Sequence, residues 1–255
     1  MSRPASPWHW APTPARRLEE VAGRLADAAW PDIPADALVL VPLGSAEQHG
    51  PHLPLSTDTL IARAVAREAA GLLRGSRPVL VAPAVPYGAS GEHADFPGTV
   101  SIGHEALGHL LVEAVRSLAL WAARVAFVNG HGGNTTTLRT FVAPLRDEGH
   151  DVGWTGCEVV GGDAHAGRTE TSLLLHLAPR HVLARRAAPG ERRPLSALMP
   201  RLRTQGVRAV SPNGVLGDPT GASAAQGRSL LRELAADTAA RLAAWHPDDQ
   251  GRLSR

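Results

Sequence analysis

Short apolar runs alternate with helical stretches along this chain, and the alternation restricts the folds it can adopt. The first apolar run, 38–43, is continuous and too short for a helix, which predicts a buried strand. The stretch 57–73 then places apolar residues at helical spacing and ends before Gly75. Further strands are predicted at 79–85, 125–128 and 152–155, and further helices at 104–123, 134–146 (with Asn134 as its cap), 169–177 and 222–245. Such an alternation predicts parallel βαβ units, and therefore a three-layer α/β/α sandwich with a mainly parallel central sheet.

Two stretches fall outside this alternation. Residues 1–30 begin with a segment rich in Pro and Trp and continue with an amphipathic piece at 15–29, which we interpret as a mobile start and a peripheral helix. Residues 183–217 are irregular and contain several Pro, Gly and Arg residues, which favours a surface excursion or a subunit contact over a second domain. No linker divides the chain, so a single domain over 1–255 is predicted.

Arginine supplies all 26 basic residues, because the sequence contains no lysine. This excludes a Schiff-base lysine and the phosphate-binding lysine of a P-loop. The arginines are spread along the chain, so nucleic-acid binding is not expected. The single cysteine fits a reducing compartment. The N-terminus lacks the apolar region of a signal peptide, and no apolar run approaches the roughly 20 residues that span a bilayer. We therefore expect a cytoplasmic protein with no membrane partner.

Acidic and histidine residues follow the predicted strands, at the edge where α/β sheets bind their ligands. They are Glu47 and His49 after the first strand, Asp58 at the start of the next helix, His131 after the strand 125–128, and His165 and Glu170 in and after the loop 161–167. Taken singly, each is more simply explained as a solvated loop residue, and Asp58 as a residue that caps a helix. Taken together at one sheet edge, they predict a metal site, and the mixture of His, Asp and Glu suits Zn(II), Fe(II) or Mn(II).

Other patterns support different chemistry less well. The turn 129–134 could hold a phosphate at a helix N-terminus, but it lacks the glycine spacing of a dinucleotide site and a P-loop lysine. Its glycines are better explained as a place where backbone N–H groups approach a substrate. No Gly-x-Ser-x-Gly motif is present, which argues against a serine hydrolase. Cys157 has no motif around it and is interpreted as a small buried residue.

The motifs resemble those of the creatininase family of metal-dependent amidohydrolases. The resemblance rests on Gly44-Ser45-Ala46-Glu47-Gln48-His49-Gly50-Pro51-His52-Leu53-Pro54 with Thr57-Asp58, on Gly91-Glu92-His93 through Phe96-Pro97-Gly98-Thr99, on Asn129-Gly130-His131-Gly132-Gly133-Asn134, and on His165-Ala166-Gly167 with Glu170-Thr171-Ser172. Together these motifs cover roughly residues 38–180. The resemblance implies a creatininase-like fold and a centre of two metal ions.

The resemblance also implies a role for each candidate ligand. Glu47 and His131 would hold one metal, His49 would hold the other, and Asp58 would bridge the two. Creatininase itself carries a glutamate two residues after the histidine that corresponds to His131, where this chain has Gly133. We predict that Glu170 takes the place of that glutamate as a metal ligand. The alternative is that Glu170 orients a ligand histidine. The expected cofactors are two divalent ions per subunit, Zn(II) together with Fe(II) or Mn(II).

The implied reaction is the attack of a metal-bridging hydroxide on an amide carbonyl. His165 matches the family's catalytic histidine and would give the leaving amine its proton or position the substrate. Gly132 and Gly133 would offer a backbone N–H to the oxyanion, and His93 is a candidate for substrate contact.

The stretches 161–163 and 214–220 resemble the mycofactocin-system branch of the family most closely. Members of that branch trim a radical-modified ribosomal precursor peptide. The resemblance implies this peptide as substrate, with release of a Val-Tyr-derived core, and a homo-oligomeric protein. The alternatives are another amidohydrolase of the family, which acts on formamides or small cyclic amides, and a metal-free scaffold.

Overall fold

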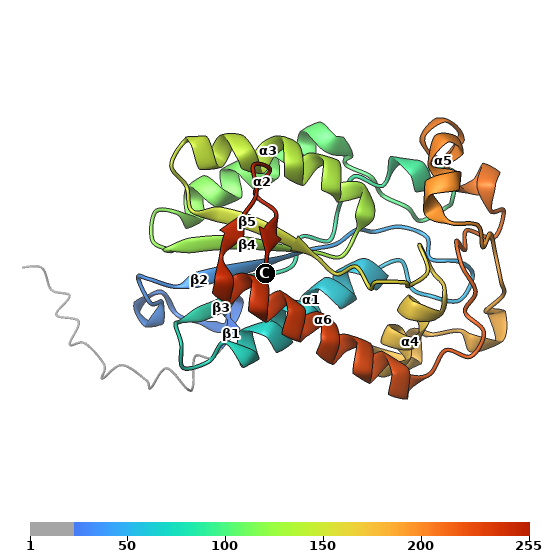
Figure 1. The fold of residues 1–255 in the computed structure, drawn as a ribbon, viewed down its shortest axis with the longest axis horizontal. Coiled ribbons are helices and arrows are strands. Elements are labelled where there is room, and N and C mark those ends of the chain that lie inside the picture. The colour runs from blue at the N-terminus through green and yellow to red at the C-terminus, as the bar shows by residue number, and fades with distance from the viewer. Residues whose placement is uncertain (1–22) are drawn as a thin grey trace, which may run out of the picture.

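The computed structural model describes residues 23–255, and its centre is a sheet of five parallel strands (Figure 1). In sheet order the strands are β1 (Gly23–Arg24), β3 (Val79–Val81), β2 (Leu38–Leu43), β4 (Arg124–Asn129) and β5 (Val152–Gly156). The two longest strands lie side by side at the centre, where Leu43 of β2 pairs with Asn129 of β4. The loops that carry the candidate ligands leave this end of the sheet.

Helices cover both faces of the sheet (Figure 1). α2 (Gly103–Leu118) and α3 (Thr135–Asp147) lie on one face, and α1 (Thr57–Leu72), α4 (Arg168–Leu177) and α6 (Ala224–Ala244) lie on the other. Side chains of β2 alternate between the two layers: Leu38 and Leu40 belong to the core beneath α1 and α6, and Val39 and Val41 to the core beneath α2 and α3. The predicted three-layer α/β/α sandwich with a mainly parallel sheet is therefore confirmed.

Most predicted elements match the observed ones within a few residues, with three local differences. The strand predicted at 79–85 ends at Val81, because Pro83 has no N–H for the ladder, although Val85 still pairs with Leu43. The helix predicted at 104–123 ends at Leu118 and is followed by a turn. Asn134 precedes α3 but its side chain makes no capping bond, because its Oδ1 accepts instead from the Ala89 N–H at 2.9 Å.

The largest correction concerns residues 183–217, which were predicted to be irregular. They contain α5 (Leu195–Val210), a helix broken at Gly206, whose φ of 73° is left-handed. Leu198, Leu202 and Val207 of α5 form a separate apolar cluster with Leu216. Pro200 and Gly206 inside the segment hide its helical periodicity in the sequence.

The peripheral helix predicted at 15–29 is also corrected where the structure describes it. Residues 15–22 lie outside the described residues, and Gly23–Arg24 form the edge strand β1 instead of helix. The remaining short elements are the C-terminal hairpin of β6 (His246–Pro247) and β7 (Leu253–Ser254), and 3-10 helices at Leu25–Asp27, Trp30–Asp32, Gly91–His93, Gly132–Asn134, Pro179–His181 and Ala184–Arg186. None of the helices described in 23–255 is long and apolar enough to cross a membrane.

Candidate metal centre

The loop after β2 and the first turn of α1 bring the first candidate ligands together. Gly44 lies directly against Thr59 of α1, where a Cβ atom would come within 2.5 Å of the Thr59 backbone. This close approach places the loop over Asp58, and the Ser45 hydroxyl donates a hydrogen bond to Asp58 Oδ2 at 2.7 Å. Glu47 follows two residues after Ser45, and its carboxylate is completely buried. Glycine at position 44 is thus required for the loop to pack on the helix.

His131 reaches the same place from the end of β4. Gly130 lies against the backbone oxygen of Asp58, where a Cβ atom would stand at 2.5 Å. The His131 ring then lies between two carboxylates: its Nδ1 is 3.2 Å from Asp58 Oδ2 and its Nε2 is 3.2 Å from Glu47 Oε2. Glu47, Asp58 and His131 each present a ligand atom within 4.8 Å of the others, so they could hold one metal ion.

The loop after β5 contributes the other side of the centre. Its turn at Ala166 has a φ of 53°, a left-handed conformation that alanine rarely adopts, and this turn leads into α4. Glu170 Oε2 accepts a hydrogen bond from the Ala166 N–H at 2.6 Å and lies 3.8 Å from His49 Nε2. His49 Nε2 is also 2.9 Å from Asp58 Oδ1.

His49, Asp58 and Glu170 therefore form a second group that could hold an ion. Asp58 belongs to both groups, with Oδ2 facing His131 and Oδ1 facing His49. One carboxylate that presents an oxygen to each side is the arrangement expected of a ligand that bridges two ions. The structure thus brings all five predicted ligands into one contiguous cluster.

The donor set fits divalent cations. Both carboxylate oxygens of Glu47 are buried and accept no hydrogen bond from the residues described, which is costly for a charge unless a cation balances it. His49 Nδ1 donates to the backbone oxygen of Glu47 at 3.1 Å, so a bound metal would take the place of the second ring proton, which without an ion lies on Nε2 facing Asp58 Oδ1 at 2.9 Å. Carboxylate oxygens and imidazole nitrogens suit Zn(II), Mn(II) and Fe(II).

The pKa shifts in this cluster have the same origin. Burial raises the pKa of Asp58, but the charge of His49 and the hydrogen bonds from His131 and His49 outweigh it and hold the pKa well below its usual range. Burial lowers the pKa of His49, yet the charge of Asp58 raises it to about 10. For His131, Glu47 and Asp58 likewise outweigh burial and raise the pKa. A divalent cation can take the place of these protons.

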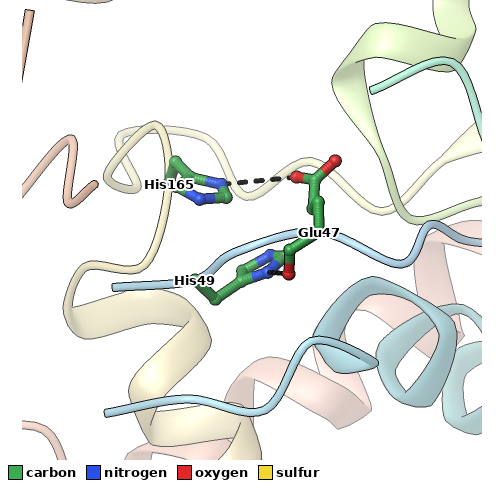
Figure 2. A group of neighbouring side chains, drawn as sticks. All are labelled: Glu47, His49 and His165. Atoms are coloured by element: carbon green, nitrogen blue, oxygen red, sulfur yellow. Dashed lines mark hydrogen bonds and ion pairs between the residues drawn. The ribbon is translucent and has the colours of Figure 1, made fainter. Parts of the chain in front are cut away.

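His165 lies over the His49 ring and beside Glu47, and Figure 2 shows its ring facing the Glu47 carboxylate. Its Nε2 donates to the backbone oxygen of Gln48 at 2.8 Å, which leaves Nδ1 unprotonated, 3.8 Å from Glu47 Oε1. Burial and the nearby charge of His49 hold the pKa of His165 well below its usual value. His165 is therefore neutral, with a proton-accepting nitrogen directed at the centre.

Gln48 also belongs to the site, although its sequence position did not reveal its contacts. Its amide Nε2 donates to His93 Nδ1 at 2.8 Å, and its Oε1 accepts from the Gly50 N–H at 2.9 Å, which fixes the orientation of the amide. His93 Nε2 then carries the proton and points at Glu47 Oε1, 3.4 Å away. His93 is 4% exposed and lies next to Glu47 in this arrangement, and its contact with substrate stays a prediction.

The two glycines predicted to contact substrate differ in their surroundings. Gly132 borders the cavity in front of the centre, with nothing within 4 Å of its Cβ position. Gly133 instead lies against His131, Ala89 and the carboxylate of Glu92, which is 2.8 Å from the Gly133 Cβ position. Glu92 Oε1 is also 3.7 Å from His131 Nε2. Glu92 thus fills the space beside Gly133, and the Gly91-Glu92-His93 motif was the signal that could have identified it.

A cavity of about 780 Å³ opens onto the centre. Asp58, His131, His165 and Glu170 form its floor, and the loops at 157–164 and 191–195 form its walls, together with residues 216–220. A cavity of this size can hold several residues of an extended peptide or a small organic molecule. A substrate in it would lie directly against both metal-binding groups.

Comparisons with known proteins agree with this geometry. A mycofactocin precursor peptide peptidase of Mycobacterium tuberculosis is 52% identical over 245 residues, which covers 93% of this chain and 98% of that protein. Its counterpart in Mycobacterium ulcerans is 54% identical over 232 residues, or 89% of this chain and 90% of that protein.

Solved structures lead to the same family. A creatinine amidohydrolase (creatininase) matches with a TM-score of 0.74 at 25% identity, covering 89% of this chain and 99% of that one. Creatininases described as an Mn form and as a Zn-Zn type variant match with TM-scores of 0.71 and 0.70 at 25% identity, covering 89% and 91% of this chain and 100% and 97% of theirs. The family model Creatininase, described as creatinine amidohydrolase, matches residues 26–242. The resemblance seen in the motifs is confirmed, and the protein belongs to the creatininase family.

Proposed function

We propose that this protein is a metal-dependent peptidase that cleaves the C-terminal part of a radical-modified mycofactocin precursor peptide and releases its Val-Tyr-derived core. The observation that carries the proposal is the similarity, above 50% identity over about nine tenths of the chain, to relatives named as peptidases for this precursor. The cavity in front of the centre is large enough for a peptide segment. The substrate is therefore a peptide, and the reaction is hydrolysis of an amide bond.

The proposed cofactors are two divalent ions per subunit. Glu47 and His131 would hold the first ion, His49 and Glu170 the second, and Asp58 would bridge them. We favour Zn(II) together with Fe(II) or Mn(II), and the similarity to creatininases described with Mn and with two Zn supports this range. When bound, the ions would polarise the scissile carbonyl and lower the pKa of a water molecule.

The chain's own residues would position the substrate and move the proton. His165 Nδ1 is unprotonated and faces the centre, so it can accept a proton from the attacking water and deliver it to the leaving amine. Gln48 holds His165 in this tautomer through its backbone oxygen. Gly132 borders the cavity with open space beside it, so its backbone can approach the substrate carbonyl.

The decisive experiment is incubation of the metal-loaded protein with the modified precursor peptide, followed by mass spectrometry. We expect two fragments, one of which is the small C-terminal core. If the peptide stays intact while formamides or small cyclic amides are hydrolysed, the protein is a different amidohydrolase of the family. Well under one ion per chain after reconstitution would instead indicate a metal-free scaffold.

We also propose that the protein forms a homo-oligomer, as the family resemblance implies. α5 and the loops around it, within residues 183–217, are our candidates for the subunit contact. Light scattering on the purified protein would give the mass in solution, and a mass equal to one chain would contradict the proposal.

A further inference from the structure

The walls of the cavity carry several charged side chains outside the metal centre. They are Glu158, Asp163, Arg168, Glu191, Arg192, Arg193 and Asp218. Most are neutralised in pairs: Arg192 lies 2.5 Å from Asp218, Arg193 lies 2.8 Å from Glu191, and Glu158 pairs with Arg252 at 2.8 Å. These pairs leave little net charge for a ligand to recognise.

Asp163 is stabilised by hydrogen bonds instead of an ion pair. Its carboxylate accepts hydrogen bonds from the backbone N–H groups of Arg168, Thr169 and Asp218, at 3.0, 3.0 and 3.1 Å, and a fourth from the Thr169 hydroxyl. These bonds hold the start of α4 against the loop that contains Asp218. Asp163 therefore serves the fold and is not available to a substrate.

Arg168 is the exception on this wall. Its side chain forms no ion pair with the residues described in 23–255, and among these residues it donates one hydrogen bond, from Nε to Gln226 Oε1 at 2.8 Å. Gln226 is itself fixed, because its Oε1 also accepts from the Ser172 hydroxyl at 3.2 Å and its N–H donates to the cap residue Ser223. The guanidinium is thus held at the cavity by α6, while its two terminal nitrogens stay free for a ligand.

Position along the chain links Arg168 to the metal centre. Arg168 is the first residue of α4, and Glu170 lies two residues further in the same turn. Both line the same cavity, so a molecule that contacts Arg168 can extend to the floor where the candidate ligands lie. Arg168 is exposed to solvent, but its side chain lines the cavity and is fixed there by the bond to Gln226. The guanidinium, with its planar pair of donors, matches a carboxylate.

We propose that Arg168 binds a carboxylate of the peptide substrate and so sets the register of the peptide over the metal centre. This inference rests on the proposed peptidase function, because it assigns the bound group to that peptide. The carboxylate has two possible sources, an acidic side chain of the peptide or its terminal carboxylate. Either source would form charge-assisted hydrogen bonds with the two terminal nitrogens of Arg168.

The test measures binding separately from cleavage. The probe is the synthetic precursor peptide, compared with versions in which each Asp or Glu is changed singly to Asn or Gln and with a version amidated at its C-terminus. Binding to metal-loaded protein is measured by fluorescence anisotropy in a His165→Asn background, which is expected to bind the peptide without cutting it. We expect one neutralised version to bind about tenfold more weakly, and its identity shows the source of the carboxylate.

Substitutions of Arg168 decide whether this residue is responsible. Arg168→Gln should remove the tenfold preference, and Arg168→Glu should reverse it in favour of the neutral peptide. Arg228→Gln is the matched control, since Arg228 is an exposed arginine of α6 outside the cavity lining, and the preference should stay. Because each result is a ratio within one protein, a partly unfolded sample does not alter it.

The outcomes separate this inference from the proposed function. The role of Arg168 is overturned if the protein that keeps Arg168 shows no preference for the charged peptide. It is also overturned if that preference persists in Arg168→Gln, even if the modified peptide is cleaved. A preference that depends on Arg168 supports the role. Failure of the wild-type protein to cleave the modified peptide would overturn the peptidase and leave the carboxylate site as a property of a different amidohydrolase.

Discussion

The two metal-binding groups differ in how deeply they are buried. In the first group, the side chains of Glu47, Asp58 and His131 are 0%, 2% and 5% exposed, and His131 lies 3.2 Å from each carboxylate. In the second group, Glu170 is 19% exposed, borders the cavity and lies 3.8 Å from His49. Asp58 is the one ligand that both groups share.

This difference in burial predicts that the two ions bind with different affinities. Without an ion, the first group would leave the Glu47 carboxylate buried and short of hydrogen bonds, which is costly. The ion-free state of the second group is less costly. Burial raises the pKa of Glu170 to about 7, so a proton can neutralise its carboxylate near neutral pH. We therefore expect a tightly held ion at Glu47 and His131, and a more exchangeable ion at His49 and Glu170.

Replacement of the shared ligand should have the largest effect. Asp58→Asn removes the charge that faces both histidines, so both ions should be lost and hydrolysis should fall by at least about a thousandfold. Metal content by mass spectrometry and initial rates measure the two effects. Asp36→Asn, an exposed change with the same loss of charge, is the control and should keep both ions. Two ions per chain in Asp58→Asn would contradict a bridging role.

Replacement of the unshared carboxylates should separate the two groups. Glu170→Gln should leave about one ion per chain and slow hydrolysis by about a hundredfold, since its amide oxygen can still accept from Ala166 N–H. Glu47→Gln should instead release the ion that resists chelators in the wild-type protein. Chelator titrations of both variants measure this. If Glu170→Gln retains both ions with unchanged affinity, Glu170 only orients His49 and the comparison fails.

The sequence was sufficient for the fold where local patterns were strong. The continuous apolar run 38–43 coincides with β2, and 57–73 with α1, because burial on both faces and helical spacing leave few alternatives. α5 was missed because Pro200 and Gly206 interrupt its periodicity, while its stability comes from contacts with distant Leu216 and Phe96. Single-domain organisation over 1–255 stays a prediction.

For the site, the sequence predicted which residues lie together as candidate ligands, but not which other side chains contact and orient them. The ligand candidates follow strands at one sheet edge, so their proximity could be inferred from topology alone. The positions of Gln48 and Glu92 could not, because they depend on contacts across 45 and 39 residues, to His93 and His131 respectively. The burial of His93 could not be inferred either, since its position in the sequence is that of a loop residue.

A smaller effect is expected from Asp163, which holds the loop beside the second group. Burial raises its pKa, but hydrogen bonds from the N–H groups of Arg168, Thr169 and Asp218 outweigh it and lower the pKa. Its stabilisation is therefore complete above the unfolded value of about 3.9 and is lost as the pH falls through the lower folded value.

Asp163→Asn should lower the free energy of unfolding of the ion-free protein by about 2 kcal/mol at neutral pH, and the difference should shrink below about pH 4. Urea denaturation at a series of pH values measures this. The same variant should weaken the second ion by about tenfold and leave the first unchanged. Equal weakening of both ions would show that the two groups respond as one unit.

The smallest effect is expected from Glu92, which lies beside the first group. Its carboxylate is 3.7 Å from His131 Nε2 and 32% exposed, so solvent screens its interaction with the ligand histidine. Glu92→Gln should weaken the first ion by only about threefold, and Glu105→Gln, an exposed change on α2, should have no effect. Competition with a chelator of known affinity measures the difference. A loss of a hundredfold or more would place Glu92 among the ligands of the first ion, so that this group would reach further toward solvent than the burial of Glu47 and Asp58 indicates.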